Sequence, residues 1–157
     1  MRIAVGSDER TPLTDAVLEA LKRREVETEL YGALSLDGRE SLWPQVGHNV
    51  ARRVATGACQ EGILFCWTGT GVAIAANKVP GVRAALCADA ATAAGARQWN
   101  HANVLVMSLR LTSPGVAREI LDTWFSTPYG GGEDAECVAQ LAAIERAWAG
   151  ATSAGNQ

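Results

Sequence analysis

The chain has 157 residues, of which 48% are hydrophobic and 20% are charged, and its formal net charge is −3. This length and composition suit one domain with a substantial core. Lysine and arginine form no basic cluster, no apolar run reaches the roughly 18 residues of a membrane span, and no signal-peptide pattern follows Met1. We therefore expect no nucleic-acid partner, no membrane contact and a cytoplasmic location.

The four cysteines and two histidines are spaced neither as metal ligands nor as a secreted disulfide framework. We therefore expect reduced thiols and no metal site. Cys59 and Cys87 are interpreted as small core hydrophobes, which is the usual role of a buried cysteine.

In chain order, the first part predicts a strand at residues 2–6, a helix from about 13 to 24, a strand at 26–30, a polar loop at 32–45 and a helix at 46–57. The second half of the sequence predicts a strand at 61–67 with a helix starting near residue 72. It then predicts a strand at 82–88 with a helix at 89–100, and a strand at 103–109 with a helix at 113–126. A last helix is expected at 135–149. Ser113-Pro114 is a helix start signal.

The alternation of strands and helices predicts an α/β fold with a parallel sheet and helices on both faces. We expect one domain at residues 1–149 and a flexible tail at 150–157. In such sheets, ligands bind beyond the carboxyl ends of the strands. The loops that follow the first and third strands, SDER at 7–10 and CWTGTG at 66–71, should therefore face one crevice.

The glycine-rich turn at residues 66–71 places a thiol against exposed backbone amides. Gly69 and Gly71 leave backbone N–H groups uncovered near the start of a helix, and such groups favour the binding of an anion. The turn lacks both the P-loop and the G-x-G-x-x-G motifs, which disfavours a nucleotide site. Cys66 could ionise there and remove a proton next to a carbonyl, although a plain turn with a buried structural cysteine is the alternative.

The segment C-x-T-G-x-G-x-x-I-A-A-N-K at residues 66–78, continued by VPGVRA, resembles the core signature of the ribose-5-phosphate isomerase type B and galactose-6-phosphate isomerase family. The likeness extends over residues 1 to about 149. Its further members are Gly6-x-Asp8, Pro44, Arg97-Gln98-x-Asn100, Asn103-Val104-Leu105, Arg110 and Tyr129-x-Gly131-Gly132.

The resemblance implies a Rossmann-like domain that forms a homodimer or homotetramer with active sites at the subunit interface. It also implies an aldose–ketose isomerase that acts through a cis-enediolate without metal or organic cofactor. Cys66 would be the base. The groups expected to support the substrate are the hydroxyl of Thr68, the amides of Gly69, Thr70 and Gly71, and the side chains of Asp8 and Asn100.

Several positions depart from the family pattern. Glu9 stands where a histidine is usual, and Trp99 replaces the histidine expected to open the sugar ring. His101 could replace that histidine if it turned inward, and is otherwise expected at the surface. The residues expected to contact the substrate also include Glu9, Trp43, Trp67, Trp99 and Arg110.

The last helix departs further from the family pattern. Its start carries Glu133, Asp134 and Cys137 where the family has basic residues that hold the substrate phosphate. Two functions therefore remain open. One is an isomerase for a short, open-chain or unphosphorylated sugar. The other is a noncatalytic or heteromer-forming relative that binds a polar ligand.

Overall fold

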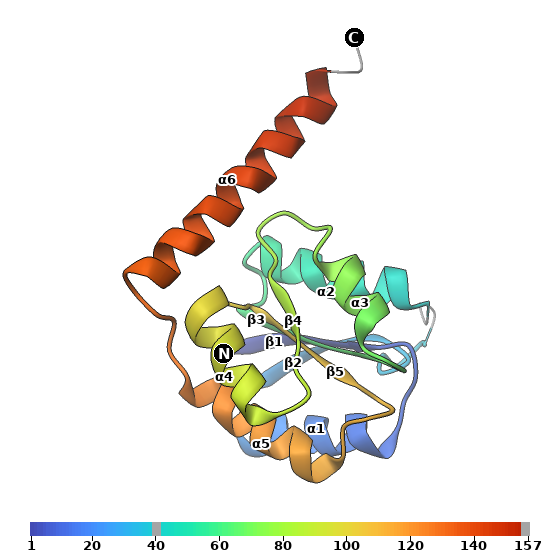
Figure 1. Ribbon diagram of the computed structural model, residues 1–157. Coiled ribbons are helices and arrows are strands. Elements are labelled where there is room, and N and C mark those ends of the chain that lie inside the picture. The colour runs from blue at the N-terminus through green and yellow to red at the C-terminus, as the bar shows by residue number, and fades with distance from the viewer. Residues whose placement is uncertain (39–41, 155–157) are drawn as a thin grey trace.

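Five parallel strands form the centre of the fold, in the order β2-β1-β3-β5-β4 (Figure 1). They are β1 (Arg2–Ser7), β2 (Glu27–Gly32), β3 (Glu61–Cys66), β4 (Ala84–Leu86) and β5 (Val104–Ser108). The computed structural model describes residues 1–38 and 42–154. The α/β fold expected from the alternating pattern is confirmed.

Helices cover both faces of the sheet. They are α1 (Pro12–Arg23), α2 (Trp43–Ala55), α3 (Thr70–Ala76), α4 (Ala90–Asn100), α5 (Pro114–Ser126) and α6 (Glu133–Ala154). One apolar core joins the sheet to α1, α4 and α5, and a second joins it to α2 and α3. Helix α6 extends away from these layers as an arm (Figure 1). No helix within the described ranges is long and apolar enough to cross a membrane.

The central strand β3 shows why the sheet lies between two cores. All of its residues are buried. Ile63 and Phe65 belong to the core on the α1 side, whereas Leu64 and Cys66 belong to the core on the α2 side. Because side chains alternate along a strand, a continuous apolar run supplies both cores at once. The first core also contains Cys87 and the second contains Cys59, which confirms both as buried hydrophobes.

Helices α2 and α6 depart from their predicted bounds. Helix α2 begins at Trp43 rather than at residue 46, because Pro44 occupies its first turn instead of ending the preceding loop. Proline is well tolerated there, since the first helical amides have no intrahelical partner. Helix α6 begins at Glu133 and runs to Ala154, beyond the predicted end at residue 149. Helix α5 begins at Pro114 with Ser113 as its cap, as predicted.

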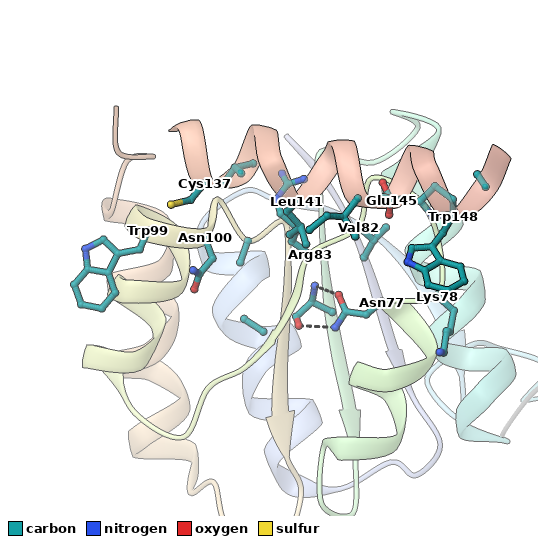
Figure 2. Close-up of a pocket in the computed structure, with 17 residues that line it drawn as sticks. Asn77, Lys78, Val82, Arg83, Trp99, Asn100, Cys137, Leu141, Glu145 and Trp148 are labelled. Carbon is teal, nitrogen blue, oxygen red and sulfur yellow. Dashed lines mark hydrogen bonds between the residues drawn. The ribbon is translucent and has the colours of Figure 1, made fainter. Parts of the chain in front are cut away.

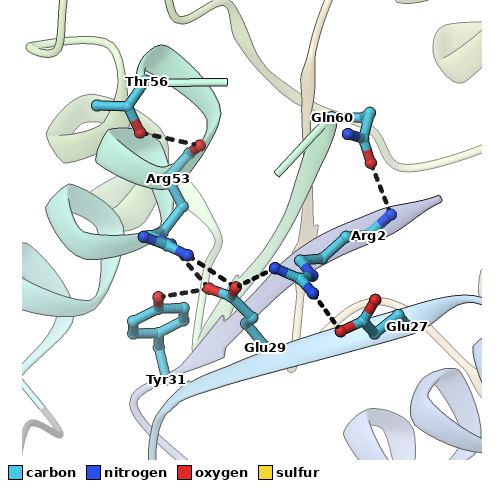
Figure 3. A network of polar contacts seen from close by, with 7 residues as sticks. All are labelled: Arg2, Glu27, Glu29, Tyr31, Arg53, Thr56 and Gln60. Carbon is cyan, nitrogen blue, oxygen red and sulfur yellow. Dashed lines mark hydrogen bonds and ion pairs between the residues drawn. The ribbon is translucent and has the colours of Figure 1, made fainter. Parts of the chain in front are cut away.

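A charged network fastens the edge strand β2 to α2 (Figure 3). The Glu29 carboxylate accepts hydrogen bonds from Arg53 Nε at 2.7 Å and Nη2 at 2.8 Å, and from the Tyr31 hydroxyl at 3.0 Å. The Arg53 guanidinium lowers the pKa of Glu29, and burial together with the bond to Glu29 raises the pKa of Tyr31 to about 12. Charges along this edge also disfavour pairing with a strand of another molecule.

A second network lies at the edge of the sheet where the strands begin. Arg97 Nη2 pairs with the buried Glu61 carboxylate at 2.9 Å, and Trp124 Nε1 donates to the other carboxylate oxygen at 2.6 Å. The Arg97 guanidinium lies 4.9 Å from the Trp124 ring centre and 4.4 Å from that of Tyr129. His101 stacks on Tyr129 with ring centres 4.6 Å apart.

This stacked group determines where α6 leaves the domain. His101 Nε2 lies 2.8 Å from the Gly130 carbonyl oxygen, and the Gly130 amide donates to the Gln98 carbonyl at 2.9 Å. His101 is therefore half-buried in a structural contact and not a surface residue. Its backbone ends α4 in the left-handed region with φ 47°, which directs the chain back toward β5.

Candidate active site

Cys66 lies at the carboxyl edge of the sheet, between the ends of β1 and β5. Cys66 is 5% exposed, and in the parallel sheet it lies opposite Ser108, the last residue of β5. The Ser108 hydroxyl donates to the Trp67 carbonyl at 2.9 Å, which holds the chain just beyond Cys66 in place. The thiol thus belongs to a rigid part of the fold, where small displacements of a reacting group are avoided.

Asp8 reaches the same edge from β1. Ser7 is paired with Phe65, so Asp8, one residue further on, lies level with Cys66. Its Oδ1 atom is buried and has no hydrogen-bond partner among the described residues, and burial raises the pKa of the Asp8 carboxyl. A buried acceptor without a partner is costly to the fold and is commonly explained by a function. Glu9 follows it on the exposed surface of the same loop.

Backbone conformation at Gly69 and close packing at Gly71 both favour glycine in the turn. Gly69 has φ +80°, and a Cβ atom there would lie 2.5 Å from Leu86 Cδ1. A Cβ atom at Gly71 would lie 3.0 Å from two ring atoms of Trp43. The Trp43 indole therefore packs directly on the turn, at the start of α3, where the sequence places it near the substrate. The Gly69 amide donates to the Cys66 carbonyl at 3.1 Å and closes the turn. This amide, one of the three expected to support the substrate, is therefore already bonded within the chain.

The exposed side chains of the turn are Trp67, Thr68 and Thr70. The two threonine hydroxyl oxygens are 2.7 Å apart and hydrogen-bonded to each other. Arg110 is also exposed, and its amide donates to the Trp67 carbonyl at 3.0 Å. Asp8, Cys66 and the glycine turn are thus brought to one edge, as expected for the loops that follow the first and third strands, and Trp43 and Arg110 lie at the same edge.

Trp99 and Asn100 lie at the opposite edge of the sheet. Helix α4 runs antiparallel to the strands and ends at Asn100, where the chain returns to begin β5. The Gly62 amide donates to the Asn103 carbonyl at 3.0 Å, which places this end of α4 beside the start of β3. Cys66 is four residues further along the strand, about 13 Å away at the usual rise per residue. Within one chain, Asn100 and Cys66 do not share a site.

A groove of about 1090 Å³ separates α6 from the domain (Figure 2). Trp99, Asn100 and Cys137 line one part of it, and Cys66 does not line it. Its floor is held by Asn77, whose amide exchanges two hydrogen bonds with the backbone of Ala84. This contact gives the asparagine of the A-A-N-K motif a structural role.

The side of α6 that faces the groove is apolar and exposed. Leu141, Ile144 and Trp148 line the groove at 51%, 58% and 71% exposure. Such a large exposed apolar set on one helix is typical of an interaction surface. Glu145, on the same helix, accepts a hydrogen bond from the Gly81 amide at 2.9 Å and fixes the arm to the domain.

The first turn of α6 carries Glu133, Asp134 and Glu136. Carboxylates are stabilising at the amino end of a helix because they oppose the helix dipole. These acidic residues therefore have a role in folding, whatever else they contact. Cys137 is exposed on the next turn.

A family model described as Ribose/Galactose Isomerase matches residues 3–141 of this chain. The chain belongs to this family of sugar isomerases. The match extends from the first strand into α6, so it includes both edges of the sheet that carry the residues described above.

Individual relatives agree with this assignment. The chain is 36% identical to ribose-5-P isomerase B of Listeria innocua, over 84% of this chain and 88% of that protein. It is 33% identical to D-erythrulose-4-phosphate isomerase of Pectobacterium atrosepticum, over 92% and 95%. The structure of Clostridium thermocellum ribose-5-phosphate isomerase B superposes with a TM-score of 0.87 at 36% identity, covering 94% of this chain and 99% of that one.

Sequence reasoning did not anticipate three features of the site. These are the position of Ser108 beside Cys66, the contact of Leu86 with Gly69, and the hydrogen bond between Thr68 and Thr70. Ser108 carries a readable signal, because it is a polar residue that ends an otherwise apolar strand. The other two depend on the folded geometry of the turn, which the sequence pattern does not encode.

Proposed function

We propose that this chain is an aldose–ketose isomerase in which Cys66 is the catalytic base. The observation that carries the proposal is the grouping of Cys66, the buried Asp8 oxygen and the glycine turn at one edge of the sheet, in a member of a sugar isomerase family. A base, an acceptor for a substrate hydroxyl and uncovered amides are the groups that enolisation of a sugar requires.

In the proposed reaction, the Cys66 thiolate removes the proton from the carbon next to the carbonyl. The electrons of that C–H bond form a carbon–carbon double bond, and the carbonyl oxygen becomes an oxyanion. The amides of Thr70 and Gly71, at the start of α3, stabilise this oxyanion. The thiol then returns its proton to the neighbouring carbon. Thr68 and Asp8 hold the substrate hydroxyls.

The complete site is formed by two copies of the chain. A single chain places Cys66 at one edge of its sheet and Trp99 and Asn100 at the other, so it cannot bring them together. In the proposed site, Asn100 and Trp99 of one copy therefore reach Cys66 of the other. The exposed apolar side of α6 supports this arrangement, since association would cover Leu141, Ile144 and Trp148. A homodimer with isologous contacts would contain two equivalent sites.

The substrate is a short, open-chain or unphosphorylated sugar. Cys137 lines the groove beside Asn100, and Glu133 and Asp134 precede it on the same helix end. A carboxylate close to a phosphate would cost on the order of 1–4 kcal/mol, and Arg110 could offset about one such contact. Trp99 and Glu9 supply no imidazole for opening a sugar ring. The erythrulose-phosphate relative supports a four-carbon skeleton.

The test is a panel of four-, five- and six-carbon sugars, each with and without phosphate, incubated with the protein in deuterated water. Deuterium at the carbon next to the carbonyl reports enolisation even where net conversion is slow. We expect tetroses and neutral sugars to exchange faster than ribose 5-phosphate. Micromolar affinity for ribose 5-phosphate with efficient conversion would refute the substrate assignment.

A matched variant tests the acidic helix end directly. Glu133→Arg combined with Cys137→Arg restores two basic residues, so phosphate-bearing sugars should bind more tightly. The gain should shrink as salt rises, because exposed charges are screened. Unchanged binding at low salt would show that this end of α6 does not face the substrate.

The second candidate is a noncatalytic relative that binds a polar ligand. It is favoured by Glu9 and Trp99, which replace both histidines expected from the family resemblance. Binding of a sugar without any deuterium exchange, across the whole panel, would support it over the isomerase.

A further inference from the structure

Two threonine hydroxyls follow Cys66 in the glycine turn and, among the described residues, form a hydrogen bond only with each other. Thr68 and Thr70 are both exposed, and their hydroxyl oxygens are hydrogen-bonded at 2.7 Å. Helix α3 begins at Thr70 with Gly69 as its cap, and no side-chain hydrogen bond caps it. Serine and threonine near a helix start commonly satisfy backbone amides. Here the hydroxyls bind each other instead.

The proposed reaction leaves one proton transfer unassigned. Converting an aldose to a ketose moves a hydrogen from C2 to C1, which Cys66 performs, and also a proton from O2 to O1. As the C2 carbonyl forms, the O2–H bond must break, and O1 must gain a proton to become a hydroxyl. A single thiol that is occupied with the carbon-bound proton cannot perform both transfers in one passage through the enediol.

We propose that Thr70, together with Thr68, carries the proton from O2 to O1; this inference rests on the proposed isomerase function. O2–H donates its proton to one threonine oxygen, that hydroxyl passes its own proton to the second, and the second hydroxyl donates to O1. Both threonines end as hydroxyls, so no further donor or acceptor is needed. The vicinal oxygens of a cis-enediol are about a hydrogen-bond length apart, which matches the spacing of the threonine oxygens.

Thr70 goes beyond what the family signature defines. In the signature C-x-T-G-x-G, Thr68 occupies a defined position, whereas residue 70 occupies an open one. An apolar residue there would leave the turn, the α3 start and the backbone amides unchanged, and it would remove the second hydroxyl. Thr70 therefore adds a donor and an acceptor that the signature alone does not require.

The experiment compares Thr70→Val, which has the same shape without the hydroxyl, with Thr70→Ser, which keeps it. D-Erythrose 4-phosphate, D-erythrose and ribose 5-phosphate serve as probes in deuterated water. Two quantities are measured for each: deuterium at C2 of the remaining aldose, and the amount of ketose formed. Circular dichroism and urea unfolding check the fold, and Thr70→Ala repeats the measurement if valine disturbs it.

We expect Thr70→Val to lower ketose formation by about tenfold to a hundredfold while C2 exchange continues. The ratio of exchange to conversion should therefore rise, and Thr70→Ser should restore it. An unchanged ratio, even with both rates lowered, would overturn the relay, because the hydroxyl would then serve only in binding or orientation. Absence of exchange in the unmodified protein would instead refute the isomerase function itself.

Discussion

Replacing Glu61 with leucine should destabilise the protein strongly. Its carboxylate and the Arg97 side chain are only 8% and 12% exposed, and their atoms are 2.9 Å apart. Without Glu61, a buried guanidinium loses its counter-charge and the Trp124 N–H loses its acceptor. Breaking one member of a buried pair typically costs about 3–5 kcal/mol, so we expect Glu61→Leu to lower the free energy of unfolding by that amount.

Urea unfolding at neutral pH and fixed protein concentration measures this loss. Glu27→Leu is the matched control, because Glu27 pairs with Arg2 at the exposed surface, where such pairs contribute less than about 1 kcal/mol. Arg97→Leu combined with Glu61→Leu should cost less than the sum of the single changes, since no charge is left unpaired. A loss below about 1 kcal/mol for Glu61→Leu, or strict additivity, would refute the reasoning.

Four further outcomes are expected. Cys66→Ser should reduce the rate of deuterium exchange more than tenfold with the fold intact, which is equivalent to more than about 1.4 kcal/mol of barrier. Burial raises the pKa of Cys87 to about 12, so this cysteine should resist thiol reagents in the native state. An equal mixture of Cys66→Ser and Asn100→Ala chains, each inactive alone, should regain about a quarter of the exchange rate after subunit exchange, because half of the dimers would hold one intact site of two. No recovery would show that Asn100 of one chain does not complete the Cys66 site of another. Glu29→Gln should destabilise the protein at pH 7, and the difference should vanish in urea titrations as pH falls through the lowered pKa of Glu29, since Arg53 stabilises only the ionised carboxylate.

Much of the fold follows from local pattern. The apolar run at residues 61–67 predicts a strand buried on both faces, and Ser113-Pro114 predicts a helix start, because both features act within a few residues. The start of α2 could not be placed in this way. Pro44 is compatible both with a loop and with the first turn of a helix. The helical turn is accompanied by packing of Trp43 on Gly71, a residue far along the chain.

The candidate site is predictable only in part for the same reason. Cys66, Asp8 and the glycine turn follow strand ends, and parallel strands bring such ends together. Asn100 is the last residue of α4, and the direction of that helix carries it to the other edge. His101 appears as a polar surface residue in the sequence, whereas its stacking on Tyr129 depends on how the segment before α6 returns to α4.

The groove under α6 also bears on inhibitor design. It is lined by Asn100 and by the apolar side of α6, and Cys66 lies outside it. In the proposed two-chain site, Asn100 of one copy reaches Cys66 of the other, so a small molecule that fills this groove would also occupy space that the sugar needs. Under the proposed association of two chains, such a molecule would also oppose their association, and its potency would fall as either the protein or the sugar concentration rises.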